Sequence, residues 1–422
     1  MKRELSLEVC RSVIQSIVSQ IGENYVLVKT AEEIGHHLQA KLESDAYGTC
    51  TDVHALARAV TADLQAISKD RHLRVWHDPE QAADIERRKE RDRPSDDETR
   101  RWMAHLRHEN FGFARVERLT GNVGYLDMRN FFESELGGET AVAAMNYLAN
   151  SNAVIFDLRR NGGGSPSMIQ LLTSYLYDTE PRHLNTFHFR PTDSYRQFWT
   201  FPYVPGRRMQ DVPVYVLTSS FTFSAAEEFT YNLKHMGRAT VVGETTAGGA
   251  HPVQRHSATE GFVIAIPYGR AINPITDANW EGTGVEPHIA VPQAQALQTA
   301  HLHALETVIE NCTDDEYLSR LRWDLETVRA TYTPADVEEA VLSRYAGQFA
   351  DRSIALIDGT LVHEYRGLEE ELLPITESRF VVGPLERVEF VTGEDGAVTH
   401  LMVDNFRGQR MTIPKTQSDT RS

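Results

Sequence analysis

The sequence predicts an α/β core, with a helical domain before it and an antiparallel β domain after it. Three observations support this fold class. Residues 6–67 show helical periodicity, residues 111–291 alternate short apolar runs with helical patterns, and two Asp-Gly turns lie between β-like runs nearer the C-terminus. Alternating strands and helices are typical of α/β domains, and Asp-Gly turns are typical of hairpins. We therefore expect three differently built parts in a chain of 422 residues.

The N-terminal helical domain is predicted over residues 1–75. Apolar residues recur at helical spacing in three stretches. They are Val9, Val13, Ile14, Ile17, Val18 and Ile21 in the first, Ile34, Leu38 and Leu42 in the second, and Val53, Leu56, Val60, Leu64 and Ile67 in the third. Residues 76–110 are dense in Arg, Glu and Asp, and a run of mixed sign predicts a charged linker or an exposed helix.

The α/β core is predicted over residues 111–300. Its strands are expected at "FARVERL", "NVGYLDM", "AVIFDLR", "PVYVLTS", "ATVVGET" and "GFVIAIPYG", and its helices at 138–149, 166–177 and 225–236. Residues 301–335 predict a helical connection. Residues 336–416 predict the antiparallel β domain, because "SIALIDGTLVHEY" and "RVEFVTGEDGAVTHLMV" read as hairpins.

Composition and charge exclude several classes of protein. The formal net charge of -17 argues against nucleic acid or an anionic membrane as the main partner. The three cysteines lack the spacing of a metal site or a disulfide framework. No stretch approaches the ~18 apolar residues of a membrane span. We expect a cytoplasmic protein, with export after removal of a signal as the alternative.

Ser224 stands at a junction that suits a nucleophile. In "LTSSFTFSAAEEF" it follows a strand-like run and precedes a helical pattern. A serine becomes nucleophilic when a base takes its proton, and the N–H groups at a helix N-terminus can hold the oxyanion that forms. The amide of Ala225 is well placed for that role. A simple helix cap is the alternative.

The glycine run in "DLRRNGGGSPS" offers a second group of backbone amides. Glycine lets a backbone approach a ligand closely, so this run could complete an oxyanion hole. A phosphate cradle is a weaker alternative, because the run lacks the lysine of a P-loop. A plain glycine-rich turn is the simplest alternative.

Four motifs together resemble the S41 family of serine peptidases. "DLRRNGGG", "LTSSFTFSAAEEF", "ATVVGETTAGG" and "NWEGTGVEPHIAV" occur in the order seen in that family, and the resemblance covers roughly residues 50–295. The family includes carboxy-terminal processing proteases, the tricorn core protease and the repeats of interphotoreceptor retinoid-binding protein. The resemblance implies a crotonase/ClpP-like α/β core.

One departure from the family pattern points to a particular branch. The processing proteases carry a catalytic lysine after "GET", where this sequence has Gly249. A Ser-Lys mechanism is therefore not expected. The tricorn-like branch resembles a Ser-His-Glu arrangement instead, which implies His72 as the base, with His77 and His251 as competitors.

The same resemblance implies the remaining site residues. Glu281 in "NWEGTGVEPH" is the expected acid, with Glu286 and Glu244 as alternatives. The amides of Gly163 and Ala225 are the expected oxyanion hole. No metal and no organic cofactor are implied.

The sequence thus predicts a serine peptidase that cleaves peptides or unfolded proteins through an acyl-enzyme. The alternative is a non-catalytic binding protein for a hydrophobic ligand, such as a retinoid or a fatty acid, on the same scaffold. A catalytically idle scaffold is a third reading. Homo-oligomerisation stays open.

Overall fold

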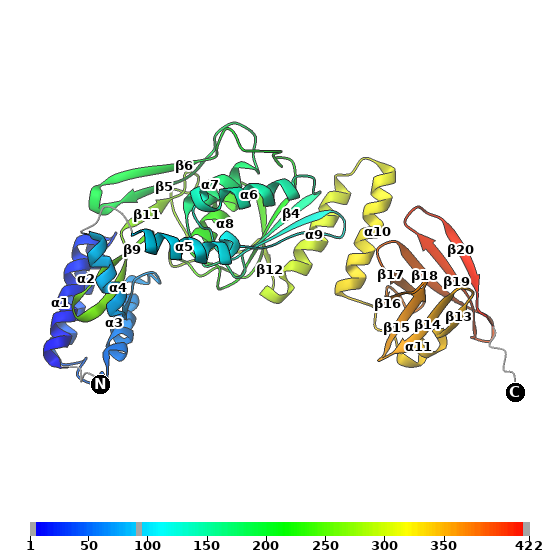
Figure 1. The fold of residues 1–422 in the computed structure, drawn as a ribbon, viewed down its shortest axis with the longest axis horizontal. Helices are drawn as coiled ribbons and strands as arrows, with labels where there is room; N and C mark the ends of the chain where they lie inside the picture. Colours follow the sequence, from blue (N-terminus) through cyan, green and yellow to red (C-terminus); the bar gives the residue numbers. More distant parts are fainter. Residues whose placement is uncertain (1–5, 90–94, 417–422) are drawn as a thin grey trace. The chain divides into compact units, whose positions relative to one another are not determined.

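The computed structural model describes residues 6–89 and 95–416, which divide into two compact units (Figure 1). The first unit comprises residues up to 117 together with 124–297. The second comprises residues 118–123 and those from 298 onward. Across the described ranges, no helix is both long and apolar enough to cross a membrane.

An N-terminal layer of three helices covers one face of a small antiparallel sheet. The helices are α1 (Leu7–Asn24), α2 (Val28–Glu43) and α3 (Val53–Ser68), and they lie side by side in Figure 1. The sheet has the order β1 (Arg74–His77), β10 (Phe262–Pro267), β9 (Val253–Ser257). Val75, Phe262 and Ile264 pack into the apolar core of the helices. The prediction assigned β10 to the α/β core, but here it pairs with β1 and completes the N-terminal layer.

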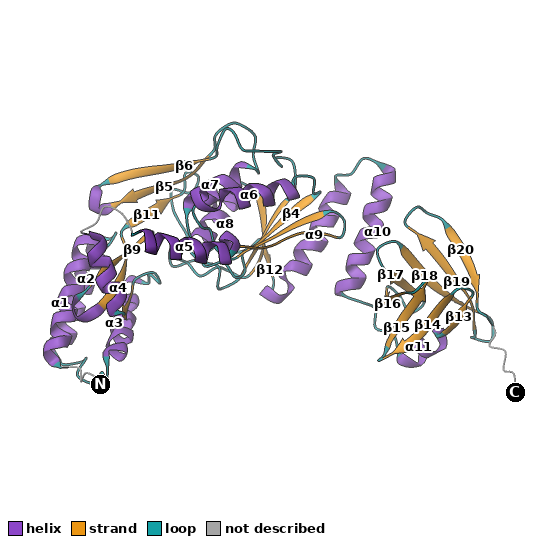
Figure 2. Ribbon diagram, viewed as in Figure 1, coloured by secondary structure: helices purple, strands orange, loops and turns teal. Residues whose placement is uncertain are grey.

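The central sheet positions the motifs. Its order is β12 (Ile289–Ala290), β8 (Ala239–Gly243), β7 (Val214–Thr218), β4 (Ala153–Asp157), β3 (Val123–Met128), β2 (Phe113–Leu119). The strands from β12 to β4 pair in parallel. Three helices contribute to the same apolar core, namely α6 (Ser134–Leu148), α7 (Pro166–Ser174) and α8 (Ala225–His235) (Figure 2). The α/β class predicted from the sequence is confirmed.

The rest of the first unit surrounds this core. Residues 76–110, predicted as a charged linker, include the helices α4 (Pro79–Lys89) and α5 (Asp96–His108), and residues 90–94 lie outside the described ones. A third sheet has the order β11 (Gly269–Ile272), β5 (His183–Phe189), β6 (Ser194–Trp199). Short 3₁₀ turns occur at Asn110–Gly112, Arg190–Thr192, Thr259–Gly261 and Gln293–Gln295.

The second unit holds the antiparallel β domain that the two Asp-Gly turns predicted. Its helices are α10 (Asp315–Tyr332), α11 (Glu339–Tyr345) and most of α9 (Ala296–Glu310). Eight strands follow in chain order, each antiparallel to the next: β13 (Gly347–Phe349), β14 (Arg352–Ile357), β15 (Thr360–Tyr365), β16 (Leu368–Pro374), β17 (Arg379–Val382), β18 (Glu386–Thr392), β19 (Val398–Asn405) and β20 (Arg410–Pro414). A bridge between Phe349 and Lys415 brings the first strand beside the end of the last, which makes the sheet barrel-like.

Candidate active site

Two loops meet at the carboxyl ends of neighbouring parallel strands. The glycine run follows β4, and the turn that carries Ser224 follows β7, which pairs with β4. Open α/β sheets commonly bind ligands at this edge. The loops are joined by hydrogen bonds, since the Phe223 amide donates to the Asn161 carbonyl at 3.2 Å and the Thr222 hydroxyl donates to the Leu158 carbonyl at 2.9 Å.

Gly163 lies directly against the serine turn. Its φ is +108°, and a Cβ added there would be 2.7 Å from Ser224 Cβ and 3.0 Å from the Ala225 nitrogen. Only glycine fits such a position without a shift of the backbone. The predicted convergence of Gly163, Ser224 and Ala225 is therefore present in the fold.

The backbone of Ser224 adopts an unusual conformation. Its φ is 56° and its ψ is -121°, whereas an ordinary N-cap residue lies in the β region. A non-glycine residue with positive φ is strained, and such residues cluster at functional sites. A strained serine on a strand-to-helix turn is also the geometry of a nucleophile elbow. Ser224 also forms a capping box with Glu227 at the start of α8, so its strained conformation adds to a capping role and does not replace it.

A buried carboxylate fixes this turn. One oxygen of Glu227 accepts the amides of Ser224 and Gly249 at 2.9 and 2.8 Å, and the other accepts the Gly248 amide at 2.6 Å and the Thr246 hydroxyl at 2.5 Å. Burial raises the pKa of Glu227, while these four donors oppose the rise. Glu227 therefore ties the nucleophile turn to the loop that follows β8.

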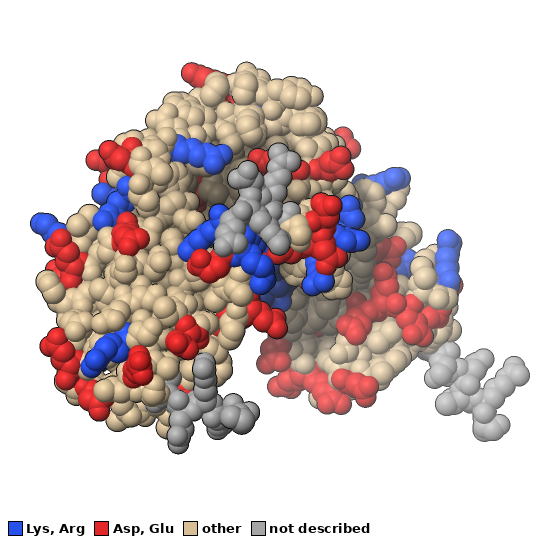
Figure 3. Space-filling model, turned by 60° about the vertical axis from the view of Figure 1, so that its left-hand side comes forward, with Lys and Arg blue, Asp and Glu red and all other residues tan. Residues whose placement is uncertain are grey.

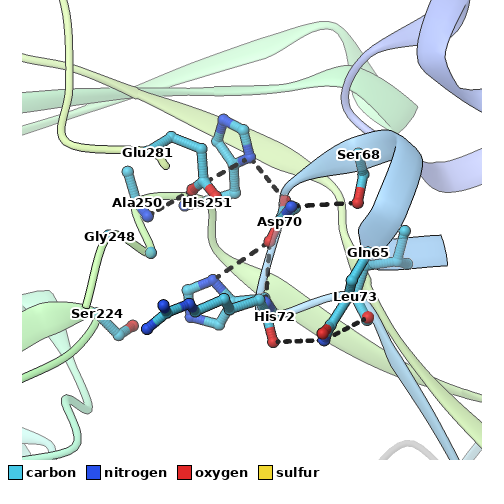
Figure 4. Close-up of polar contacts among 12 residues, drawn as sticks. Gln65, Ser68, Asp70, His72, Leu73, Ser224, Gly248, Ala250, His251 and Glu281 are labelled. Atoms are coloured by element: carbon cyan, nitrogen blue, oxygen red, sulfur yellow. Dashed lines mark hydrogen bonds and ion pairs between the residues drawn. The ribbon is translucent and has the colours of Figure 1, made fainter. Parts of the chain in front are cut away.

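His72 reaches the serine from the N-terminal layer. It lies between α3 and β1, and its ring packs against Phe223 with the centroids 4.3 Å apart. Figure 4 shows the Ser224 side chain pointing toward the His72 ring. The imidazole is 8% exposed, and burial lowers its pKa to about 4, against the opposing effect of Asp70. A neutral imidazole is the form that can accept a proton from serine.

Asp70, which the sequence reasoning missed, is the acid beside His72. One Asp70 oxygen accepts the His72 amide at 2.9 Å and lies 3.8 Å from His72 Nδ1. The other oxygen lies 2.9 Å from His251 Nδ1. Asp70 is completely buried and stands between the two imidazoles (Figure 4).

Glu281, the predicted acid, joins this group at its far end. Its Oε2 accepts the amides of Ala250 and His251 at 2.6 and 3.2 Å and lies 3.5 Å from His251 Nδ1. Among the contacts of the described residues, Glu281 is linked to His72 through His251 and Asp70. Burial raises the pKa of Glu281 to about 7, and the nearby charge of Asp70 adds to the rise.

The same three side chains offer the ligand atoms that a metal ion would need. One nitrogen of His251 and one oxygen each of Asp70 and Glu281 lie within 4.8 Å of one another. These atoms already serve protein partners, since Glu281 Oε2 accepts two backbone amides and Asp70 Oδ2 lies at hydrogen-bond distance from His251. A metal ion would have to displace those contacts, so we do not assign one here.

The two predicted oxyanion donors differ in availability. The Ala225 amide has no hydrogen-bond partner within the described part of the chain, as expected for the first residue of α8. The Gly163 amide donates to Asn161 Oδ1 at 2.9 Å. Gly163 can hold an oxyanion only if it exchanges that bond.

The alternative residues have other surroundings. His77 contacts Phe262 and the Glu260 carbonyl, and Glu244 accepts the amides of Ser220 and Gln293. Glu286 is exposed. At Gly249 a Cβ would lie 2.2 Å from the Phe223 ring and 2.7 Å from the His72 ring, so this arrangement leaves no room for the lysine of a Ser-Lys site.

Two family models match the chain. The model of peptidase family S41 matches residues 122–291, which contain Ser224 and every strand of the central sheet except β2. The model of the N-terminal domain of this family in eukaryotic IRBP matches residues 7–103, which contain His72. The chain belongs to peptidase family S41. This is a family of serine-type peptidases, the enzyme class that the four motifs predicted.

Solved structures show more distant likenesses to this S41 chain. A photosystem II D1 C-terminal processing protease is 19% identical over 40% of this chain and 42% of its own, with a TM-score of 0.32. A putative peptidase from Parabacteroides merdae is 18% identical over 67% and 90%, with a TM-score of 0.46. The tricorn protease is 13% identical over 72% and 37%, also with 0.46. This chain covers less than half of the first and third proteins, and the family assignment rests on the two family models.

Proposed function

We propose that the protein cleaves peptide bonds through an acyl-enzyme on Ser224, with His72 as the general base. The strained backbone of Ser224, on a turn beside a buried and neutral imidazole, is the observation that carries the proposal. Peptides and unfolded proteins are the proposed substrates, because the chain belongs to a peptidase family.

The proposed reaction has two halves. Ser224 Oγ attacks the substrate carbonyl carbon, and its proton passes to His72 Nε2, since Nδ1 faces Asp70. The tetrahedral intermediate collapses, the C–N bond breaks, and the imidazolium gives its proton to the leaving amine. Water then attacks the acyl-enzyme with the same imidazole as base, which releases the second product and restores Ser224.

The acidic part of the site departs from a simple Ser-His-Glu arrangement. We propose that Asp70 orients His72 and stabilises its charged form, because it is the carboxylate closest to that ring. Glu281 then acts on His72 indirectly, because it holds His251 in contact with Asp70. The proposed oxyanion donors are the amides of Ala225 and Gly163. Each such donor is typically worth about 3–4 kcal/mol in the transition state.

A fluorophosphonate probe tests this proposal. We expect one adduct, on Ser224, that disappears in Ser224→Ala and falls strongly in His72→Ala. Ser220→Ala is the matched control, because Ser220 is an exposed serine of the same loop and should leave labelling unchanged. An adduct at another residue, or full labelling of His72→Ala, would contradict the proposal. No labelling together with tight binding of a fluorescent fatty acid would favour the binding-protein alternative.

A further inference from the structure

A second buried glutamate lies on α8, one turn after Ser224. Glu228 is 3% exposed, and its amide donates to the Ser224 carbonyl at 2.9 Å, so it belongs to the helical turn that follows the proposed nucleophile. Figure 3 shows Asp and Glu side chains spread over the face in view, where water solvates their charge. Glu228 lacks that solvation, and the proposed reaction gives it no role.

The side chain of Glu228 lies against Asn185 of β5. A β-bulge between His183 and Asn185 interrupts the pairing of β5 with β6, and bulges commonly redirect a side chain. Asn185 is completely buried, and neither its Oδ1 nor its Nδ2 forms a hydrogen bond of regular geometry with another described residue. Its amide therefore offers both an acceptor and a donor to Glu228.

Two further amides extend this polar cluster. Asn232 lies one turn after Glu228 on α8, and its Oδ1 accepts a hydrogen bond from Asn273, just after β11, at 3.1 Å. Both asparagines are buried, and Asn232 Nδ2 has no hydrogen-bond partner within the described part of the chain. The cluster thus combines three uncharged amides with a single carboxyl group.

No charged group contributes to the pKa of Glu228 among the described residues. Burial raises this pKa to about 8, and the contact with Asn185 alone opposes the rise. On α8 itself, the Glu227 carboxylate faces the loop after β8, while α7 and β8 contain no titratable residue. The other charged or titratable side chains of α8, β5 and β11 are Tyr231, Lys234, His235, His183, His188 and Arg270.

A neutral carboxyl group matches Asn185 better than a carboxylate does. The neutral group has one O–H donor and one carbonyl acceptor, so it can bind Oδ1 and Nδ2 of the amide at the same time. A carboxylate only accepts hydrogen bonds. It would leave Asn185 Oδ1 unpaired and a buried charge without a counter-ion, and both are costly in a protein interior.

We infer that Glu228 is a positioning residue that acts in its neutral form, through paired hydrogen bonds with Asn185 that hold the N-terminus of α8 in place. Ser224 and the Ala225 amide lie at this N-terminus. Ionisation of Glu228 breaks the pairing, so activity is lost in alkaline solution. The effect on activity rests on the proposed function, whereas the pairing itself does not.

The sign of the pH dependence follows from the direction of the shift. Because the folded pKa of Glu228 lies above its usual value of 4.5, the linked stability is fully present below pH 4.5. It is lost as the pH rises through about 8, where the folded protein itself ionises. This is the opposite direction to the effect of His72.

The fluorophosphonate probe measures the effect on the proposed nucleophile. Labelling of Ser224 in the native protein should fall about tenfold between pH 7 and pH 9, as Glu228 ionises. Glu228→Gln carries an amide that donates and accepts but does not ionise, so its labelling should be within about twofold of native at pH 7 and should not fall at pH 9. Glu139→Gln, an exposed glutamate of α6, is the matched control and should keep the native fall. An equal fall in the native protein and in Glu228→Gln would overturn the inference.

Hydrogen exchange separates this inference from the proposed function, because it needs no catalysis. Amides of the first turn of α8 should lose protection between pH 7 and pH 9 in the native protein, after correction for intrinsic rates, and should keep it in Glu228→Gln. Asn185→Leu should lose protection at both pH values, since the carboxyl group then has no partner. Equal protection of the native protein and Glu228→Gln at both pH values would overturn the inference. The expected protection pattern without labelling at any pH would support the pairing and refute the proposed function.

Discussion

At the scale of single residues, His72 lies in surroundings that favour its neutral form. Burial lowers its pKa to about 4 from a usual value of 6.5. Because the folded pKa is the lower one, the stability linked to this group is present above pH 6.5 and is lost as the pH falls toward 4. The neutral base thus persists through the mildly acidic range.

The first prediction concerns the pH dependence of cleavage. If His72 is the base, the acid limb of kcat/KM should fall well below pH 6.5, because kcat/KM reports the pKa values of the free enzyme. A pH series on a neutral peptide from pH 4 to 9, with stability followed in parallel by circular dichroism, measures this. An acid limb centred at pH 6.5 would contradict the buried setting of His72.

The second prediction ranks the acids. Asp70→Asn should lower kcat about 10²- to 10⁴-fold, because an amide cannot stabilise the imidazolium that forms on His72. Glu281→Gln should lower kcat by about tenfold or less, since Glu281 contacts His251 and not His72. Steady-state kinetics on both variants, with unfolding curves to confirm folding, gives the ranking. A larger loss in Glu281→Gln would show that the order is reversed.

The sequence identified several of these residues but not their connections. Ser224 and the glycine run are recognisable because each follows an apolar strand and matches a family motif. Asp70 carries no such signal, since the sequence does not show that its carboxylate turns back toward His72 or that it contacts His251, 181 residues further along the chain. The link between them exists only after β1 pairs with β10.

At the scale of elements, the N-terminus of α8 depends on Glu227. This carboxylate accepts three backbone amides, from Ser224, Gly248 and Gly249, and is completely buried. The strands that surround it were predicted from apolar runs. The strands β5, β6, β9 and β11 were not, and β6 and β9 carry mostly exposed residues that give little apolar pattern.

The third prediction tests the Glu227 clamp. Glu227→Ala should lower the free energy of unfolding by about 2 kcal/mol or more, because it leaves buried donors without acceptors. It should also reduce labelling of Ser224. Glu227→Gln is the matched control and should be milder, since its amide oxygen still accepts. Urea unfolding and probe labelling measure both effects, and a Glu227→Ala protein with native stability would refute the clamp.

At the scale of the whole molecule, two units have separate apolar cores. Phe390 lies in the core of the second unit and stacks on Tyr345 with the ring centroids 4.1 Å apart. Phe262 lies in the N-terminal core of the first unit. The Asp-Gly hairpins were sufficient to predict that the second unit contains an antiparallel sheet. No sequence pattern predicted that residues 118–123, which interrupt the first unit, belong to the second.

The fourth prediction is that the two units unfold separately. Phe390→Ala should remove about 3–5 kcal/mol from the second unit and lower one of two transitions in calorimetry. Labelling of Ser224 should be unchanged below that transition. Phe262→Ala is the reciprocal variant, expected to lower the other transition and to reduce labelling. A single transition that both variants shift equally would show one cooperative unit.

The pairing of β1 with β10 also has a consequence for synthesis on the ribosome. A nascent chain that ends at Gly249 already contains both Ser224 and His72. It lacks residues 262–267, which form β10. This strand pairs with β1, the segment that follows His72. Hydrolytic competence would then arise only late in translation, after most of the first unit has emerged.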